Sequence, residues 1–206
     1  MLFDRLAGRK RRRVTRTTAD RPLALGLVAL VAMLAAGCGG DEEDAAAAAT
    51  GEAPKSGFVA DAQGSGARMW IDAKLNGDSD ALVELWAAEL GPVLGYSAHL
   101  RFDTEHLEND PAGAPSAEPA LGAAAEEAVH LATALPGDVA FGGTRRSPTL
   151  GEADLGAATL LGQARLHARA ASTSRLSLER VVARRADGGY LQLTALGGEL
   201  TTVGAP

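Results

Sequence analysis

Strict alternation of apolar and polar side chains is the feature that most limits what this chain can fold into. The segment from Val93 to Asp103 places an apolar or small side chain at every second position, and residues 158–170 do the same. Because successive side chains of a strand point to opposite faces of a sheet, each segment is predicted to be a half-buried β-strand. The polar residues on the predicted outward faces are Ser97, His99 and Arg101 in the first segment and Gln163, Arg165, His167 and Arg169 in the second.

Shorter alternating runs extend this pattern through most of the chain after residue 57. Residues 69–75 and 82–88 alternate in the same way, and Asn76-Gly77 lies between them. Asn-Gly tolerates the positive φ angles of tight turns, so the two runs are predicted to form a hairpin. Asp187-Gly188-Gly189 is a second turn signal of the same kind. Further strands are predicted at 138–143, 174–183 and 190–203, the last of them broken at Gly197-Gly198.

Two segments interrupt the alternation. Residues 109–135 are rich in Pro, Ala and Gly at their start, and their later part predicts a short helix around Leu121–Leu131. Residues 144–157 are predicted to be a polar loop. Many short strands with long surface connections predict an all-β fold, in which residues 57–206 form an antiparallel, jelly-roll-like β-sandwich.

The first 38 residues have the composition of an export signal. They contain eight of the twenty Lys and Arg residues but only two acids, and five of the cations form the run Arg9–Arg13. An apolar segment without charged side chains follows at 22–36, which is shorter than the roughly 20 residues that span a bilayer. Cationic flanks stay on the cytoplasmic side of a membrane, so the rest of the chain is predicted to cross it.

The run Leu34-Ala35-Ala36-Gly37-Cys38 resembles the lipobox of bacterial lipoproteins and holds the only cysteine of the chain. The resemblance implies that residues 1–37 are a signal peptide, cleaved between Gly37 and Cys38. It also implies that lipid on Cys38 anchors the chain in the bacterial cell envelope, on the periplasmic side or the outer surface. Lipoboxes usually place a large aliphatic residue three positions before the cysteine, where this chain has Ala35 preceded by Leu34. The alternative is an uncleaved transmembrane anchor at 22–38 with an incidental thiol.

Residues 38–56 are predicted to be the lipidated cysteine followed by a flexible linker, because their low-complexity, acidic and alanine-rich sequence cannot bury enough apolar area to fold. After residue 38 the chain carries 12 basic and 24 acidic residues, a net charge of -12. Proteins that bind nucleic acid need a basic patch to neutralise phosphates. The charge therefore excludes nucleic acid as the main partner.

The order of these features resembles a cohesin domain, the jelly-roll-like sandwich of bacterial extracellular adhesion and scaffolding proteins. The resemblance rests on Leu90–Asp103 (LGPVLGYSAHLRFD), a strand that ends in an aromatic-Asp pair, and on Leu107-Glu108 after it. It covers about residues 67–203 and departs from the family in the Ala-rich stretch 112–128. It implies a domain that performs no chemistry and binds a partner module, typically a calcium-loaded dockerin, through one sheet face.

Five residues on predicted outward faces are candidates for a binding surface. Arg101, Arg165 and Arg169 would form a basic stripe on an acidic domain, with His99 and His167 beside them. A solvated face whose cations pair with nearby carboxylates is the alternative. The two histidines could meet across strands, but without a third ligand they do not predict a zinc site.

Trp70 and Trp86 form a second candidate site, because each points away from the inward residues of its predicted strand. They would make an aromatic platform for sugar if they are exposed. They would have a structural role if they pack beneath the 109–135 connection, as large aromatic side chains usually do.

Neither a catalytic site nor a metal site is predicted. Gly95–His99 is similar to a serine elbow, but it lacks the second glycine and lies in a strand. Asn76, Asp78 and Asp80 begin like a calcium loop, but the glycine and glutamate of later loop positions are missing, so calcium binding there stays open against an ordinary turn. We expect no enzyme activity and no cofactor. The sequence thus favours a lipid-anchored envelope or cell-surface protein that binds another protein, with a carbohydrate-binding or solute-capturing module as the alternative.

Overall fold

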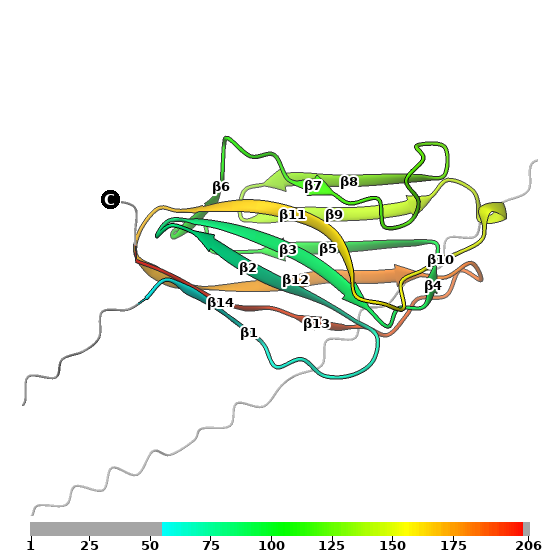
Figure 1. The fold of residues 1–206 in the computed structure, drawn as a ribbon, viewed down its shortest axis with the longest axis horizontal. Helices are drawn as coiled ribbons and strands as arrows, with labels where there is room; N and C mark the ends of the chain where they lie inside the picture. Colours follow the sequence, from blue (N-terminus) through cyan, green and yellow to red (C-terminus); the bar gives the residue numbers. More distant parts are fainter. Residues whose placement is uncertain (1–54, 204–206) are drawn as a thin grey trace, which may run out of the picture. The chain divides into compact units, whose positions relative to one another are not determined.

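A computed structural model of the chain describes residues 55–203, and these residues form two β-sheets that pack face to face (Figure 1). The predicted signal peptide, the Cys38 lipidation site and nearly all of the predicted linker lie outside the described residues. Among residues 55–203 there is no helix that is long and apolar enough to cross a membrane. All strand pairs are antiparallel except β13 with β2, which is parallel.

The first sheet, sheet 1, has the strand order β1-β14-β12-β5-β9-β8. Its central strand β12 pairs with β14 on one side and with β5 on the other. The strands are β1 (Gly57–Ala60), β5 (Gly95–Arg101), β8 (Ala128–Leu135), β9 (Asp138–Arg145), β12 (Ser172–Arg184) and β14 (Gly198–Thr202).

The second sheet, sheet 2, has the order β13-β2-β3-β11-β6, and the short strand β7 also pairs with β11. Its strands are β2 (Arg68–Asn76), β3 (Asp80–Ala88), β6 (Leu107–Asn109), β7 (Ser116–Ala117), β11 (Thr159–Ala168) and β13 (Thr194–Leu196). A separate two-stranded sheet joins β4 (Pro92–Val93) to β10 (Ala153–Asp154), and a 3-10 helix, η1, spans Pro148–Leu150.

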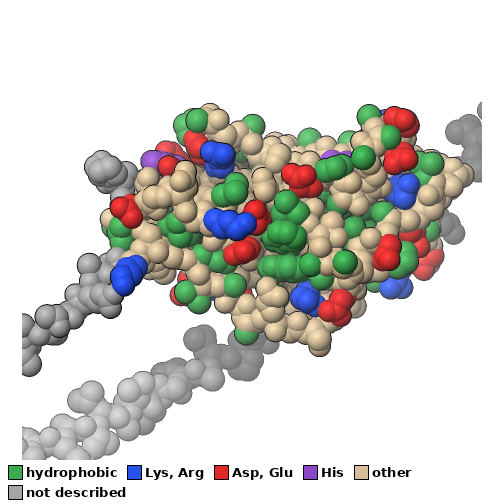
Figure 2. Space-filling view, in the orientation of Figure 1, with side chains coloured by type: hydrophobic (Ala, Val, Ile, Leu, Met, Phe, Trp, Pro, Cys, Tyr) green, Lys and Arg blue, Asp and Glu red, His purple; other side chains and the backbone are tan. Residues whose placement is uncertain are grey.

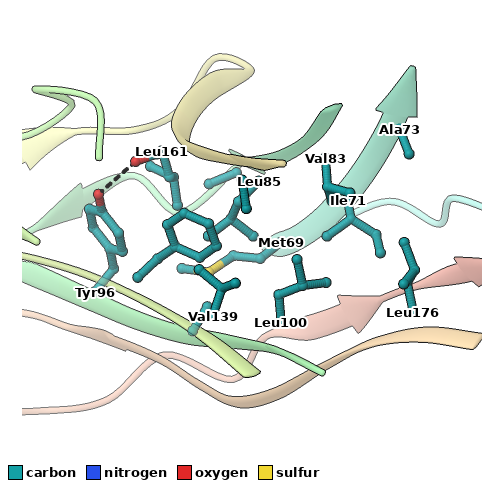
Figure 3. Close-up of a cluster of buried hydrophobic side chains, with 14 of the residues drawn as sticks. Met69, Ile71, Ala73, Val83, Leu85, Tyr96, Leu100, Val139, Leu161 and Leu176 are labelled. Atoms are coloured by element: carbon teal, nitrogen blue, oxygen red, sulfur yellow. Dashed lines mark hydrogen bonds between the residues drawn. The ribbon is translucent and has the colours of Figure 1, made fainter. Parts of the chain in front are cut away.

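The core lies between the two sheets and is built from alternate residues of their long strands. Met69 and Ile71 of β2 and Val83 and Leu85 of β3 face Leu100 and other buried side chains of sheet 1 (Figure 3). One polar contact crosses this core: the Tyr96 hydroxyl of β5 donates to the Leu161 carbonyl of β11 at 3.1 Å. The Leu161 carbonyl also accepts from the backbone N–H of Glu118 at 2.9 Å.

The strands predicted from alternation are confirmed, and so is the all-β sandwich. The β2–β3 hairpin turns after Asn76, where Gly77 has the positive φ of 81° that this turn requires. The predicted break at Gly197-Gly198 separates β13 from β14. The chain passes there from sheet 2 to sheet 1, and a Cβ on Gly197 would lie 2.2 Å from the Leu176 carbonyl oxygen, so only glycine fits this crossing.

The helix predicted around Leu121–Leu131 is wrong. Residues 125–127 form a turn, and β8 begins at Ala128 and pairs along its whole length with β9. The turn between these strands contains Pro136 and Gly137, whose φ is 69°. Alanine favours helix by a few tenths of a kcal/mol per residue, which is a weak preference against eight cross-strand pairs and the partial burial of one strand face.

The predicted phase of β11 is wrong at its start. A β-bulge lies between Leu160 and Gly162, so that Leu160 pairs with Trp86 while Leu161 enters the core with no exposed surface. Leu160 therefore lies on the outer side of sheet 2, and the alternation resumes in its predicted phase only from Gly162 onwards. A bulge adds one residue to a strand, so residues before the bulge point to the opposite face of the sheet from the one that simple alternation predicts.

Candidate functional site

The five residues predicted to form a binding face lie on opposite sides of the sandwich. His99 and Arg101 belong to β5 of sheet 1, whereas Arg165 and His167 belong to β11 of sheet 2. Arg169 directly follows β11. The structure therefore does not bring them together, and the two histidines do not meet, because β5 and β11 belong to different sheets.

The outer face of sheet 1, formed by the outward side chains of β8, β9, β5 and β12, has an apolar edge. Val129, Leu131 and Leu135 of β8 are 42%, 61% and 46% exposed. Seven large hydrophobic side chains are exposed among the described residues, and these three are the ones that share a strand. They occupy alternate positions with Thr133 between them, so all point to the same side.

Small side chains form the middle of this face. Leu131 pairs with Gly142, Gly142 with Ser97 and Ser97 with Val182, which gives one row across four strands. In the next row Thr133 pairs with Ala140 and Ala140 with His99. The apolar edge of β8 is therefore followed by a low floor of small residues, which leaves room for a partner to approach the sheet.

A network of charged side chains bounds the floor at one end. The Nδ1 atom of His99 lies 2.9 Å from Oδ2 of Asp138, which is 6% exposed. The Arg101 guanidinium lies 3.6 Å from the same carboxylate oxygen and donates to Glu179 of β12 at 3.2 Å. The second oxygen of Asp138 is buried and has no hydrogen-bond partner among the described residues. These contacts fix His99 and Arg101 in place on the face.

A second group of side chains bounds the floor on β12. The register with β5 shifts between Glu179 and Val182, and Arg180 in this bulge has a φ of 49°, in the left-handed region. A residue with a side chain is strained there, and bulges often re-aim side chains at binding sites. Close by, a hollow of about 190 Å³ is lined by Ser97, Val182, Arg184 and Tyr190, the last of which is 71% exposed.

The two arginines of this group have no ion-pair partner in the described part of the chain. Five other cations of the domain do, since Arg68, Lys74, Arg101, Arg169 and Arg175 each contact a carboxylate. Residues 55–203 carry 12 basic and 19 acidic residues, a net charge of -7. Arg180 and Arg184 are two of six arginines in these residues that contact no carboxylate, the others being Arg145, Arg146, Arg165 and Arg185, and they are the two that lie on β12 beside the floor.

The predicted residues of sheet 2 have local structural partners, with one exception. His167 Nδ1 lies 2.7 Å from Oδ1 of Asp80, its neighbour on β3. Arg169 donates to Glu108 of β6 at 2.6 Å and 2.9 Å and so ties β6 to the end of β11. Arg165 is exposed and, within residues 55–203, has no carboxylate partner.

Trp70 and Trp86 are paired residues of β2 and β3 on the outer face of sheet 2, as the alternation predicted. Their ring centroids are 6.2 Å apart and their planes differ by 16°. Both rings are half-buried. Within the 109–135 connection, Asn109 at the end of β6 and the strand β7 pair with the far side of β11, and β8 belongs to sheet 1, so none of these strands covers the tryptophans.

The segments that resemble a serine elbow and the start of a calcium loop do not have the geometry of either motif in residues 55–203. Ser97 and His99 lie two residues apart in the straight strand β5 rather than in a strand-to-helix turn. Asp80 of the Asn76–Asp80 turn is engaged with His167. Asp103, Glu105 and His106 are the group of side chains in residues 55–203 whose ligand atoms lie close enough for a metal ion, within 4.8 Å of one another, but both carboxylates are exposed.

Comparison with known proteins identifies the architecture. No family model matches the sequence, and no curated protein matches it either. Among solved structures, the second type II cohesin module of the ScaA scaffoldin of Acetivibrio cellulolyticus has a TM-score of 0.52 and 8% identity, over 66% of this chain and 91% of that one. The fold is that of a cohesin module.

Two further cohesin structures contain a bound partner. A cohesin of Clostridium acetobutylicum in complex with a dockerin has a TM-score of 0.50 and 14% identity, over 66% of this chain and 99% of that chain. A type II cohesin in complex with an X-dockerin from Acetivibrio cellulolyticus has a TM-score of 0.50 and 7% identity, over 62% of this chain and 93% of that chain. At these identities the likeness concerns the cohesin fold.

The apolar edge of this cohesin-like sandwich was missed in the sequence because β8 was predicted as part of a helix. A signal for it exists, since Val129, Leu131 and Leu135 share one alternating phase with Thr133, while Ala132 and Ala134 lie between them. The bulge at Arg180 leaves no comparable signal in the sequence. It depends on pairing with β5, which lies some eighty residues earlier in the chain.

Proposed function

We propose that this chain is a non-enzymatic binding protein that holds another protein on the outer face of sheet 1. The observation that carries the proposal is the row of exposed aliphatic side chains on β8. The outward positions of a solvated edge strand are normally polar, and an apolar patch rimmed by polar groups marks an interaction site. Protein interfaces have this anatomy, with an apolar centre and a charged or polar rim.

The positively charged rim on β12 indicates which side chains a partner would bring to this face. Arg180 and Arg184 are exposed cations without carboxylates of their own in residues 55–203, and Arg184 pairs in an isolated β-bridge with the exposed residue Tyr190. Tyr and Arg are the residue types most enriched among side chains that dominate binding energy. The partner would therefore place acidic side chains over Arg180 and Arg184 and apolar ones against Leu131 and Val129.

The cohesin fold supports a protein partner of this kind. Two of the similar structures are cohesins in complex with dockerins, and binding a partner protein in this way requires no catalytic residues. The fixed cluster of His99, Asp138 and Arg101 would supply directional hydrogen bonds at the other end of the face. Pre-organised side chains of this kind lower the entropy cost of association.

The second part of the proposal concerns location. We propose that the signal peptide is removed before Cys38, that acyl chains on Cys38 anchor the protein in the bacterial envelope, and that residues 39–56 space the sandwich from the lipid. Cysteine preceded by an apolar segment and a cationic run supports this. Mass spectrometry of the purified chain tests it: a mature, acylated N-terminal Cys38 is expected, and an intact residue 1–38 segment would contradict it.

The binding face is tested by capture from envelope extract with the full chain in detergent. Leu131→Asp should remove a protein that the unaltered chain recovers, and calorimetry with that purified protein should show a loss of at least about tenfold in affinity. Leu150→Asp is the matched control, because Leu150 is 43% exposed but lies in η1, outside the four strands. Equal loss in both variants, or none in Leu131→Asp, would refute the assignment of this face.

The rim is tested with the same partner. Arg180→Ala and Arg184→Ala should weaken binding and reduce its dependence on salt, because exposed charge pairs are screened by added ions. An unchanged salt dependence in the double variant would show that the partner does not bring acidic groups to this rim.

A further inference from the structure

A row of large apolar side chains crosses the outer face of sheet 2, on the opposite side of the sandwich from the proposed protein-binding face. Leu196 pairs with Trp70, Trp70 with Trp86, and Trp86 with Leu160, so the row spans the four strands β13, β2, β3 and β11. All four side chains are half-buried rather than covered. Figure 2 shows hydrophobic side chains gathered near the centre of this face, with cationic and acidic side chains beside them.

The two indole rings of this row are held in a fixed arrangement. They are stacked with nearly parallel planes, and the Arg68 guanidinium lies 5.6 Å from the centroid of Trp70. Arg68 is itself fixed by its ion pair with Glu89. The Nε1 atom of Trp86 donates to Glu84 at 3.3 Å. The rings are therefore fixed before a ligand binds, and the part of each ring that the stacking and Arg68 leave exposed needs no further ordering.

A row of hydrogen-bonding side chains lies next to the apolar row. Asp72 pairs with Glu84 and Glu84 with Gln163, on the same outer side as the tryptophans. Glu84 is 6% exposed and accepts from Lys74 at 3.0 Å and from Gln163 at 3.3 Å. The buried Glu84 carboxylate therefore orients the side chains of Lys74 and Gln163. Asp72, Lys74 and Gln163 keep polar groups that can face a ligand.

The polar row opens into a pocket of about 230 Å³. Its lining is mostly apolar, from Leu75, Ala81, Leu82 and the stems of longer side chains, and it carries the polar groups of Lys74, Asn76, Asp80, Asp110 and Arg165. Carboxylates, cations and an amide are mixed in this lining, so the pocket has donors and acceptors for hydroxyl groups but no excess of positive charge. The face thus passes from an aromatic row through a polar row to a pocket that combines apolar lining with hydrogen-bonding groups.

From this sequence of surfaces we infer that the outer face of sheet 2 binds an extended, uncharged glycan. The apolar faces of pyranose rings stack on aromatic side chains, while their hydroxyls require the donors and acceptors found in the adjacent row. Adjacent strands lie about 4.8 Å apart, a spacing comparable to one sugar residue of an extended chain, so that successive residues can lie over successive strands.

Charge selects the uncharged class of glycan. The acids Asp72, Asp80, Glu84, Glu89 and Asp110 lie on or beside this face against the cations Arg68, Lys74 and Arg165, on a domain whose described residues carry a net charge of -7. A polyanion would be repelled by such a surface. This site is independent of the proposed protein-binding function, because the two faces belong to different sheets and can be occupied together.

Intrinsic fluorescence tests the inference directly, because Trp70 and Trp86 are the only tryptophans of the chain. The full chain, in a detergent without a sugar headgroup, is titrated with soluble hexasaccharides of β-linked glucose, xylose or N-acetylglucosamine, and with polygalacturonate. We expect a saturable change in emission with at least one uncharged hexasaccharide. We expect a loss of at least about tenfold in affinity in Trp86→Ala, which corresponds to about 1.4 kcal/mol.

Three control variants separate this site from the rest of the molecule. Trp86→Phe should keep part of the affinity because it keeps an aromatic ring, and Gln163→Ala should weaken binding without touching the rings. Leu131→Asp, which alters the protein-binding face, should bind the glycan normally, so failure of either proposal leaves the other intact. Absence of any emission change with all three hexasaccharides, equal affinity in Trp86→Ala, or binding of polygalacturonate alone would overturn the inference.

Discussion

Replacement of Tyr96 by Phe measures what the buried hydrogen bond from the Tyr96 hydroxyl across the core contributes. The Tyr96 hydroxyl donates to the Leu161 carbonyl at 3.1 Å and so joins β5 of sheet 1 to β11 of sheet 2. Tyr96→Phe removes this hydroxyl and keeps the buried ring. The carbonyl does not become unpaired, because the backbone N–H of Glu118 still donates to it at 2.9 Å.

The expected cost follows from this second donor. A net hydrogen bond contributes about 1 kcal/mol, whereas a buried polar group left without any partner costs about 1–3 kcal/mol. We therefore expect Tyr96→Phe to lower the free energy of unfolding by about 1 kcal/mol, or the melting temperature by about 3 °C for a domain of this size. Urea-induced unfolding, followed by far-ultraviolet circular dichroism, should show a lower midpoint with an unchanged slope.

Tyr190→Phe is the matched control, because Tyr190 is 71% exposed. It should change the free energy of unfolding by less than about 0.5 kcal/mol. Equal stability of Tyr96→Phe and the unaltered chain would refute a contribution from the hydroxyl. A loss well above 2 kcal/mol would refute the two-donor reasoning, because it would mean that the Leu161 carbonyl had lost both partners.

The same hydroxyl predicts a response to alkali. Burial, with a smaller effect from the Glu118 charge, raises the pKa of Tyr96 above its ordinary value of 10.0. The folded state therefore holds this proton more tightly than the unfolded state, and its contribution to stability is complete below about pH 10 and is lost as the pH rises further. Tyr96→Phe should lack this part of the alkaline loss, measured as unfolding midpoints between pH 9 and pH 11.

Three further predictions test other parts of the sandwich. Burial lowers the pKa of His130, whose Nε2 accepts from the Leu121 N–H at 3.2 Å, so the unfolded state binds the proton more readily. The free energy of unfolding should therefore fall as the pH drops below about 6.5. Urea midpoints at pH 7.5 and pH 5.5 should differ less in His130→Gln than in the unaltered chain, and an equal difference would exclude His130 as the source. Gly162→Ala should lower the free energy of unfolding by about 2 kcal/mol, because its Cβ would lie 2.6 Å from Cδ1 of Phe141 and 2.7 Å from the Ser116 carbonyl oxygen. A neutral effect in thermal unfolding would show that both the Phe141 ring and β7 move away easily. Arg180→Gly should raise stability by about 1 kcal/mol by relieving the positive φ of 49°, whereas Arg180→Val should lower it, and the opposite order would contradict the strain.

Alternation in the sequence was sufficient to predict those strands whose pattern is continuous. β2, β3 and β5 each alternate without interruption, and their inward residues Met69, Val83 and Leu100 are fully buried. One face of each of these strands must be buried, so the sequence alone determines which side chains enter the core. The same reasoning placed Trp70 and Trp86 on the outside.

Alternation could not show which strands lie beside one another. The five predicted binding residues share the outward phase of their strands, but the facing of a residue within its strand carries no information about its sheet. His99 and His167 were therefore grouped although β5 and β11 lie in opposite layers. The order of strands depends on long-range pairing, which a local pattern does not contain.

The two β-bulges could not be predicted from the sequence for a related reason. Leu161 and Arg180 each add one residue to a strand, and each insertion exists only relative to a partner strand. In β8 the local preference of alanine for helix opposed the tertiary pairing with β9, and the pairing prevailed. This error had the largest consequence for function, because it hid Leu131 and Val129 at the centre of the proposed protein-binding edge.

The pairing of β1 with β14 has a consequence for how the protein reaches its folded state. Gly57 lies opposite Thr201, so the first and last strands of the described chain depend on each other. Contacts between residues this far apart in sequence form slowly. A chain that emerges from its amino end cannot complete sheet 1 until its final strand has arrived, and until then the free edge of β12 remains open to pairing with other chains. The sandwich should therefore close only after β14 has emerged, and under the proposed export this means after translocation, at the stage where a chaperone that shields strand edges would matter most.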